Sequence, residues 1–273
     1  MFTSVKRIVL KLLKKYKKRT VIATFDGESG DDVCYYVVDH TYPIFHRLDR
    51  RCIEFRNNGS YVYSSVYKSE KRHFQPIYPP MQRMIDCYFV NEPKDVLVLG
   101  CAGCSIPRFL TLHYNNCRVM GVEYSERLIE IAKEYFFTDE MRKRVTLIHD
   151  DAFSYMRTKP KNEKYDLIFI DIFVANHLHP QVSDKEFIQN VYDSLNENGT
   201  AMINAFGLPK EKAEEYIQKL ESPFEVSYVL RCNAHYYIQM IKKIDERSMI
   251  GYENNISQYA NIYKRKLGYH FLG

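Results

Sequence analysis

Residues 96–110 read Val96-Leu97-Val98-Leu99-Gly100-Cys101-Ala102-Gly103-Cys104-Ser105-Ile106-Pro107-Arg108-Phe109-Leu110. The first four residues form a continuous apolar run, which is typical of a strand buried on both faces of a parallel sheet. Small side chains follow at positions 100–105, where a ligand could approach the backbone beside the N-terminus of the next predicted helix. The stretch therefore predicts an α/β fold with a ligand-binding loop after its first strand.

Strands and helices alternate through the following residues, which predicts right-handed crossovers and a mostly parallel sheet covered on both faces. We expect strands at residues 95–100, 118–123, 145–150, 165–173 and 200–206, and helices at 106–114, 126–137, 151–157 and 185–195. A helix at 209–220 and two strands at 224–231 and 236–241 then predict a C-terminal antiparallel hairpin.

The part of the chain before this region has a different pattern. Short alternating runs at residues 34–38, 44–48, 52–55 and 61–67 predict a small antiparallel β region, and Pro79 and Pro80 predict the start of a helix. Residues 1–19 contain eight Lys or Arg and no acid, with apolar residues at helical spacing. We therefore predict a basic amphipathic arm at 1–19, a β region at 20–77 and a Rossmann-like domain at 78–273.

Charge argues against a nucleic-acid partner. The formal net charge is +5, but without the arm the remaining residues carry −3, so the body has no basic surplus to meet phosphates. The arm either packs on its own protein or a second subunit, or contacts an anionic membrane surface. No apolar run reaches the roughly 20 residues of a membrane span, and no secretory signal is recognised.

Seven cysteines, an odd number, favour reduced thiols and a cytoplasmic location. Cys101 and Cys104 have the C-x-x-C spacing of a redox or zinc site, but no second pair follows, so we expect no metal.

Acidic residues occupy the predicted carboxyl ends of three strands, where an open parallel sheet binds its ligand. The second strand ends in Glu123, which could hydrogen-bond the hydroxyls of a ribose. The third ends in Asp150 and Asp151, and the fourth in Asp171. We interpret Asp150 as a solvated loop residue or helix N-cap, and the other three as a site for a nucleoside with a cationic or polar tail.

These segments, together with Gly121-Val122-Glu123-Tyr124, Asp150-Asp151-Ala152 and residues 165–173, resemble the spermidine-synthase-like branch of the class I S-adenosylmethionine-dependent methyltransferase fold. The resemblance implies that Gly100, Cys101, Ala102, Gly103 and Ser105 pass under the methionine-like part of the donor and that Glu123 holds its ribose. It also implies that Asp151 accepts from the adenine amino group, that Ala152 lies beside the ring, and that Asp171 lies near the reacting sulfonium as the catalytic residue. Tyr124 either stacks on the adenine or simply begins the following helix.

Two positions depart from the spermidine synthase pattern. Gly103 stands where those enzymes have an aspartate facing the aminopropyl end of decarboxylated S-adenosylmethionine, and Val174 stands where they have a second aspartate. An acid at position 103 would stabilise a lone ammonium but repel the carboxylate of intact S-adenosylmethionine. We therefore expect alkyl transfer, most simply methyl transfer, from S-adenosylmethionine to a small-molecule acceptor.

Two alternatives stay open. One is aminopropyl transfer from decarboxylated S-adenosylmethionine, with methylthioadenosine as its product, and the other is a non-catalytic nucleoside-binding or scaffold protein. Acceptor-side candidates are Tyr63, Gln75, Tyr78, Asp171 and His177, and His177 is either a general base or a surface residue. The resemblance also implies a homo-oligomer, most simply a dimer.

Overall fold

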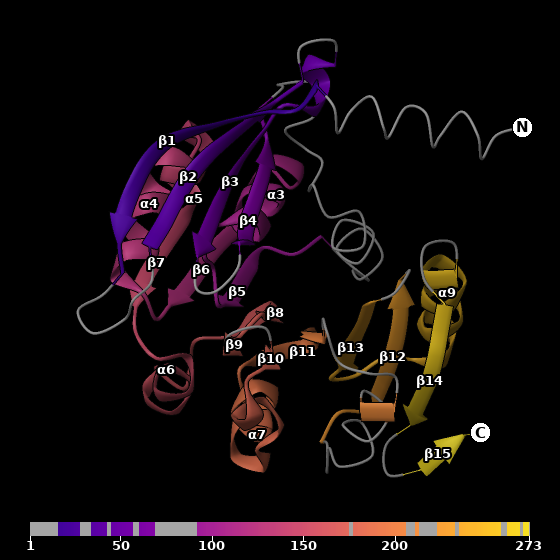
Figure 1. The fold of residues 1–273 in the computed structure, drawn as a ribbon. Coiled ribbons are helices and arrows are strands. Elements are labelled where there is room, and N and C mark those ends of the chain that lie inside the picture. The colour runs from indigo at the N-terminus through magenta and orange to yellow at the C-terminus, as the bar shows by residue number, and fades with distance from the viewer. Residues whose placement is uncertain are drawn as a thin grey trace, which may run out of the picture.

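The computed structural model describes residues 16–27, 34–42, 45–56, 60–68, 92–174, 177–205, 211–212, 223–232, 235–257, 261–267 and 270–272. At its centre lies a nine-stranded sheet in the order β15-β14-β12-β13-β11-β8-β5-β6-β7 (Figure 1). This is the α/β sheet that the alternating sequence pattern predicts, with parallel and antiparallel halves.

The parallel half contains β5 (Asp95–Leu99), β6 (Arg118–Glu123), β7 (Val145–His149), β8 (Tyr165–Ile170) and β11 (Leu195–Ala205). β5 pairs with β6 on one side, through Leu99 and Val122, and with β8 on the other, through Leu99 and Ile170. The chain winds outward from β5 in both directions, so the strand order reverses there. In sheets of this kind, ligands bind at the carboxyl ends of the strands beside such a point.

The antiparallel half contains β13 (His235–Ile241), β12 (Val226–Cys232), β14 (Asn261–Leu267) and β15 (His270–Leu272). β13 pairs with β11 and β12, so the predicted C-terminal hairpin is confirmed as part of the main sheet. β14 and β15 extend the sheet by two strands that the sequence pattern did not predict.

Helices cover both faces of this sheet because successive residues of a buried strand point to opposite sides. On one face, Val96 and Val98 share a buried cluster with α3 (Ser105–His113), α4 (Glu126–Tyr135) and α5 (Asp139–Arg144). On the other, Leu97 and Leu99 pack with α6 (Ala152–Thr158) and α7 (Lys185–Asp193). α9 (Glu246–Ser257) places Tyr252 in the first cluster.

The N-terminal part forms a separate antiparallel sheet of β1 (Lys18–Asp26), β2 (Cys34–Thr41), β3 (Arg50–Arg56) and β4 (Ser60–Tyr67). Its inner face shares a buried cluster with α4, made of Val37, Ile53, Val66, Leu128, Ile131 and Phe136. Arg51 links the two parts as well, because it bonds to Asp39 at 2.8 Å and donates to the Tyr135 carbonyl at 3.2 Å. The sheet is therefore attached to the helical layer beside the β5–α3 loop.

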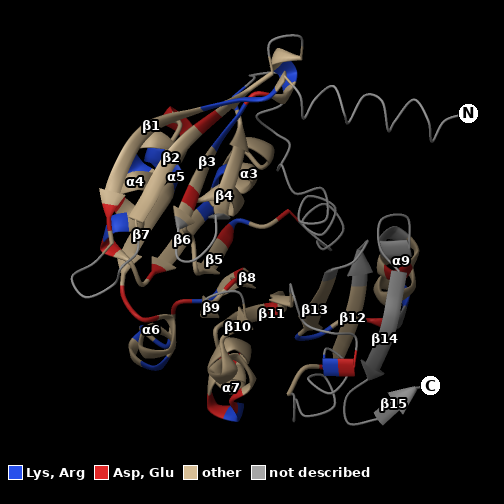
Figure 2. Ribbon diagram, viewed as in Figure 1, with Lys and Arg blue, Asp and Glu red and all other residues tan. Residues whose placement is uncertain are grey.

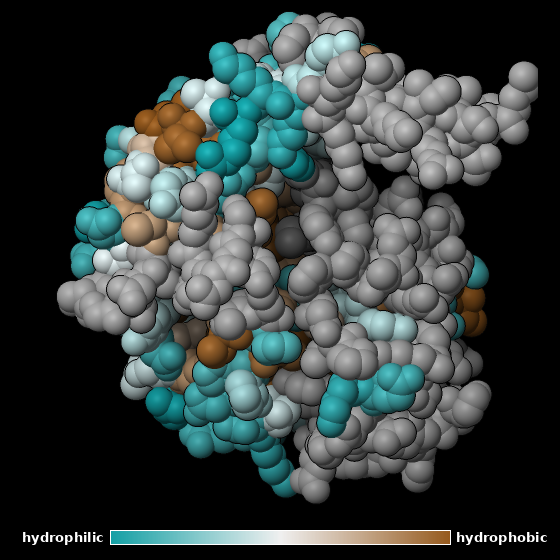
Figure 3. All heavy atoms as spheres, in the orientation of Figure 1, coloured by the Kyte–Doolittle hydropathy of each residue, from teal (hydrophilic) through white to brown (hydrophobic). Residues whose placement is uncertain are grey.

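Two apolar side chains of β1 are exposed. Val21 and Ile22 are 43% and 44% exposed, and hydrophobic atoms gather over β1 in the space-filling view (Figure 3). The strand pairs only with β2, so its other edge carries no strand among the described residues.

Several expectations differ from the structure. In the run at residues 44–48, which we expected to be a strand, His46–Leu48 form a 3-10 helix instead. β1 already begins at Lys18, inside the arm predicted for 1–19, because Lys18 pairs with Thr41 of β2. The predicted helix after Pro79 and most of the helices predicted at 1–19 and 209–220 lie outside the described residues. Within the described part, no helix has the length and apolar character to cross a membrane.

Candidate functional site

Gly100 closes the end of β5 between its two neighbours. Its N–H donates to the Val122 carbonyl of β6 at 2.9 Å, while the Asp171 N–H donates to the Leu99 carbonyl at 2.8 Å. The backbone of Gly100 has φ +84°, and a Cβ there would lie 2.3 Å from the Asp171 carbonyl oxygen. Only glycine meets both conditions, so the sequence of this turn fixes how closely the β8 end approaches the loop.

Glu123, at the end of β6, holds the loop after β5. Its Oε2 accepts the N–H groups of Cys101 and Ala102 at 2.9 and 2.8 Å, and its Oε1 accepts the Ser125 N–H at 3.0 Å. The residue is only 8% exposed. These bonds offset the positive φ of Ala102, which side-chain-bearing residues rarely adopt. The sequence predicted an acid facing a ribose, and the geometry adds that the same carboxylate shapes the loop.

Asp171 lies directly after β8 at the same edge. Burial raises the pKa of Asp171 to about 6, the nearby Glu123 carboxylate adds to the rise, and a hydrogen bond from Asn204 opposes it. That bond runs from Asn204 Nδ2 to Asp171 Oδ1 at 2.8 Å. The Asp171 carboxyl is thus poised to exchange a proton near neutral pH, as a general base requires.

Asp151 and Ala152 stand where β7 leads into α6, a segment drawn red for acids in Figure 2. Asp151 is the N-cap of α6, and its Oδ1 accepts the Ser154 N–H at 2.8 Å. The expected N-cap alternative for Asp150 is therefore wrong by one residue, since Asp150 instead accepts the Asp151 N–H at 2.8 Å. Capping orients the half-buried Asp151 side chain at the sheet edge while Ala152 is buried.

The two loop cysteines are buried free thiols. The adjacent Cys104 thiol and burial raise the pKa of Cys101 well above its ordinary value. Cys101 Sγ also fills the space beside Gly121, where a Cβ would lie 2.6 Å from the sulfur. Within the described part of the chain, no group of three or more His, Cys, Asp or Glu could hold a metal ion.

Gly103 packs against the N-terminal sheet. A Cβ on Gly103 would lie 2.7 Å from both Cβ and Oγ of Ser64 and 3.0 Å from Ile53 Cδ1. The loop therefore has no room for a larger side chain at this position. Ser105, which follows Cys104, is the first residue of α3.

Tyr63, an acceptor-side candidate, lies next to this contact. The β3–β4 register passes from Ile53–Ser64 to Glu54–Val62, so Tyr63 is the extra residue of a β-bulge. Its ring lies 4.5 Å from that of Phe55 and 6.2 Å from that of Tyr35, centre to centre. Because Phe55 and Ile53 share a face of β3, Tyr63 lies on the face of the sheet that meets the loop.

The other predicted site residues are less closely placed. Tyr124 is 70% exposed between β6 and the N-cap of α4, so its side chain points largely to solvent. His177 is exposed in β10 (His177–Leu178), which pairs with β9 (Phe173–Val174) just after Asp171. Its register partner Val174 is 54% exposed. Gln75 and Tyr78 lie outside the described residues.

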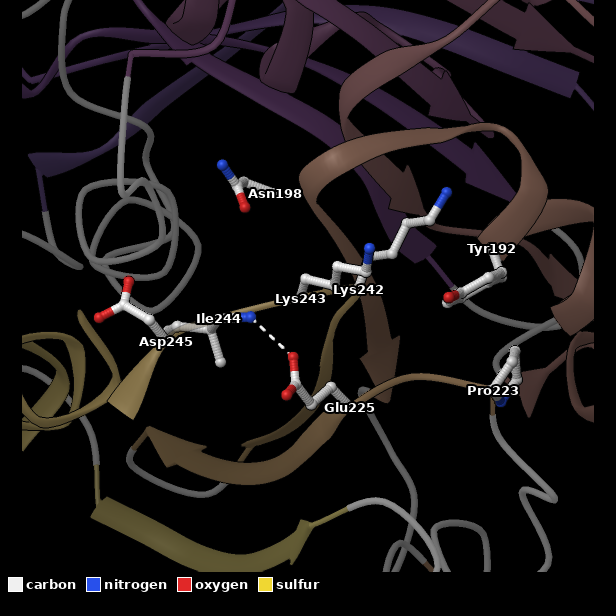
Figure 4. A pocket seen from close by; sticks show the side chains of 8 residues that line it. All are labelled: Tyr192, Asn198, Pro223, Glu225, Lys242, Lys243, Ile244 and Asp245. Carbon is white, nitrogen blue, oxygen red and sulfur yellow. Dashed lines mark hydrogen bonds between the residues drawn. The ribbon is translucent and has the colours of Figure 1, made fainter. Parts of the chain in front are cut away.

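A concavity lies at the other end of the sheet from the carboxylates of the candidate site (Figure 4). It measures about 510 Å³ and is lined by Tyr192, Asn198, Pro223, Glu225, Lys242, Lys243, Ile244 and Asp245. Lys242 follows Ile241, the register partner of Thr200, whereas Asn204 pairs with Tyr237 near the carboxylates. Lys242 stacks on Tyr192 at 4.6 Å and Lys243 pairs with Glu197 at 2.6 Å, so both cations already have partners.

Sequence reasoning missed two polar residues of the site. Asn204 is the second-last residue of β11, the fifth parallel strand, so the strand-end rule that identified Glu123 and Asp171 could also have identified Asn204. Ser64 carried no comparable signal, because it comes from the other sheet and approaches the loop only through tertiary packing.

The chain is similar to known proteins both in sequence and in fold. Residues 80–254 match the sequence model described as "Spermine/spermidine synthase domain". A polyamine aminopropyltransferase of Vibrio vulnificus is 29% identical over 174 residues, which are 61% of this chain and 56% of that protein. The mouse eEF1A lysine and N-terminal methyltransferase is 25% identical over 151 residues, which are 52% of this chain and 21% of that protein.

Among solved structures, that of a probable spermidine synthase from Corynebacterium glutamicum has a TM-score of 0.65 at 16% identity, covering 86% of this chain and 87% of that one. At this identity the likeness concerns the fold. The chain spans about half the length of the Vibrio vulnificus aminopropyltransferase and about a fifth of the length of the mouse methyltransferase.

Proposed function

Because this chain belongs to the spermine/spermidine synthase family, we propose that it is a transferase that moves an aminopropyl group from decarboxylated S-adenosylmethionine to a small amine. The observation that carries the proposal is the convergence of Glu123 and Asp171 beside Gly100 at the reversal point of the sheet. The curated polyamine aminopropyltransferases among its relatives favour this reaction over methyl transfer, which the sequence departures favoured.

The chemistry of the site suits a cationic nucleoside. Glu123, Asp151 and Asp171 lie at the carboxyl ends of β6, β7 and β8, which lie on the two sides of β5 in the order β8-β5-β6-β7. Their carboxylates favour a sulfonium and an ammonium over an anion. Glu123 and Asp151 would hold the ribose and the adenine, as the family resemblance implies. The bound donor supplies a carbon atom attached to a sulfonium sulfur, and this sulfur is a good leaving group because it departs as a neutral thioether.

Asp171 is the group we assign to proton transfer. An amine nitrogen of the acceptor attacks the carbon attached to sulfur, so that a C–N bond forms and the C–S bond breaks. The electron pair of that bond stays on sulfur, which leaves as the neutral thioether methylthioadenosine. The attacking nitrogen loses a proton to the Asp171 carboxylate, whose pKa of about 6 leaves it mostly ionised at neutral pH.

Methyl transfer is the second candidate, and the contact between Gly103 and Ser64 favours it. No acid can occupy position 103 without displacing Ser64 and Ile53, so the loop lacks a carboxylate that would reject the carboxylate of intact S-adenosylmethionine. The balanced products would then be a methylated amine, a proton and S-adenosylhomocysteine.

One experiment separates the candidates. The full chain is incubated with either donor and a panel of di- and polyamines, and the released nucleoside is identified by mass spectrometry. Methylthioadenosine from decarboxylated S-adenosylmethionine supports aminopropyl transfer, and S-adenosylhomocysteine supports methyl transfer. Binding of a donor without either product supports the non-catalytic alternative.

Matched variants show whether the site is responsible. Asp171→Asn should abolish product release, whereas Asp193→Asn should not, because Asp193 is an exposed residue at the end of α7. Loss of activity in both variants would contradict the assignment to Asp171.

Four further proposals come from the sequence analysis. They are a small-molecule acceptor, a homodimer, a cytoplasmic location and contact of residues 1–19 with a membrane surface.

A further inference from the structure

Ser64 is a buried hydroxyl without a hydrogen-bond partner. The residue is 6% exposed, and its Oγ makes no hydrogen bond with any group in the described part of the chain. Folding removes such a group from water at a cost in free energy, and buried hydroxyls are therefore nearly always paired. An unpaired one beside a ligand loop indicates that its partner arrives with the ligand.

The neighbouring serine shows the contrast. Ser65 lies on the opposite face of β4, where its Oγ is 3.1 Å from Cys52 Sγ. Ser64 pairs in register with Ile53 and faces the helical layer, where its Cβ and Oγ lie against Gly103. The two adjacent serines thus differ in the face of β4 on which they lie, and of the two only Ser64 contacts the loop after β5.

The loop after β5 is held in a fixed conformation next to Ser64. The residues before Gly103, Cys101 and Ala102, donate both of their N–H groups to Glu123. Gly103 contributes no side chain, so the polar group nearest to it from the N-terminal sheet is the Ser64 hydroxyl. This hydroxyl is neutral, and it can accept from an ammonium group without repelling a carboxylate next to it.

We infer that the Ser64 hydroxyl binds the ammonium group at the end of the donor's tail and determines how strongly the tail contributes to binding. The inference rests on the proposed function, which places the donor's tail over the loop at residues 100–105. It assigns to the N-terminal sheet a direct part in recognising the donor. It also accounts for a loop that carries glycine at position 103, because the recognition group comes from β4 instead.

The test compares ligands with and without the tail. Calorimetry measures the dissociation constants of decarboxylated S-adenosylmethionine, S-adenosylmethionine and methylthioadenosine, which has the same nucleoside but no ammonium group. The proteins are the full-length chain and its Ser64→Ala, Ser64→Cys and Ser65→Ala variants. Ser64→Ala should weaken binding of both tailed donors by roughly tenfold, as expected for a hydrogen bond to a charged group. Binding of methylthioadenosine should be unchanged.

The controls separate the alternatives. Ser64→Cys keeps the size but weakens the hydrogen bond, so it should fall between the wild type and Ser64→Ala, and Ser65→Ala should match the wild type. Equal weakening of all three ligands by Ser64→Ala would mean a structural role and overturn the inference. So would unchanged binding of all three, because the hydroxyl would then be paired with water. If the wild type binds none of the ligands, the proposed function itself fails.

Discussion

The side-chain amide of Asn204 donates a 2.8 Å hydrogen bond to Oδ1 of Asp171, joining the carboxyl ends of β11 and β8. The amide is neutral, so it stabilises the ionised carboxylate less than a lysine or arginine would. Burial therefore outweighs it, and the pKa of Asp171 rises to about 6. The pairing keeps an acid ionised near neutral pH without neutralising its charge.

Asn204→Ala should raise the pKa of Asp171 further, because it removes the interaction that lowers it. If the ionised carboxylate accepts the amine proton, activity rises as pH increases through this pKa. The rising limb of the pH profile of kcat/KM should therefore lie near pH 6 in the wild type. It should move to higher pH in the variant, as measured by product release from pH 5 to 9.

Asn196 provides a matched control for that experiment. Its Nδ2 donates to Asp166 Oδ1 at 2.7 Å, so the same pair of strands carries the same type of bond at the other end of the sheet. Asn196→Ala should leave the pH profile unchanged. A shift of equal size in both variants would show that the limb reports stability instead of the titration of Asp171.

Asp171→Asn should stabilise the protein at neutral pH. The folded-state pKa of about 6 lies above the ordinary value of 3.8, so folding favours the protonated carboxyl. The free energy of unfolding of the wild type therefore falls as pH rises through the folded-state pKa. The variant should gain about 1–3 kcal/mol in free energy of unfolding at pH 7.5, and the gain should vanish below pH 4. Urea unfolding at both pH values measures it, and an equal gain at both would exclude a charge effect.

Much of the fold follows from the sequence because its signals are local. The apolar run at residues 96–99 is followed at once by small residues, and β8 carries a similar apolar run at residues 167–170. The strand ends then place Glu123 and Asp171 together by topology alone. The antiparallel hairpin β12–β13 was also predictable from the sequence, and Cys232 pairs with His235 at its end.

The remainder depended on contacts between segments distant in sequence. The short helix α5 has charged residues at most of its positions and only Met141 buried, so its periodicity was too weak to predict it. The contact of Gly103 with Ser64 joins residues from two sheets. The bulge at Tyr63 likewise arises from the β3–β4 register, which single-strand patterns do not encode.

Glu123→Gln should weaken nucleoside binding by more than about tenfold. Glu123 accepts three backbone N–H groups, and bonds of this kind to a charged acceptor contribute about 1.5–3 kcal/mol each. The amide nitrogen of Gln would face N–H donors with another donor, so the loop should also lose its conformation. Calorimetry with methylthioadenosine measures the effect. Glu126→Gln, an exposed residue in the first turn of α4, should bind like the wild type.

Gly100→Ala and Gly251→Ala should change stability in opposite directions. At Gly100 the new Cβ would lie 2.3 Å from the Asp171 carbonyl oxygen on a backbone with φ +84°, so the end of β5 must move away from β8. We expect a loss of at least about 1–3 kcal/mol in free energy of unfolding, together with loss of donor binding. At Gly251, inside α9, nothing lies within 4 Å of the new Cβ, so better helix propensity should add about 0.5–1 kcal/mol. Urea unfolding of both variants tests this contrast. A Gly100→Ala protein as stable as the wild type would show that the turn tolerates a side chain. The close approach of Gly100 to Asp171 would then not be required for stability.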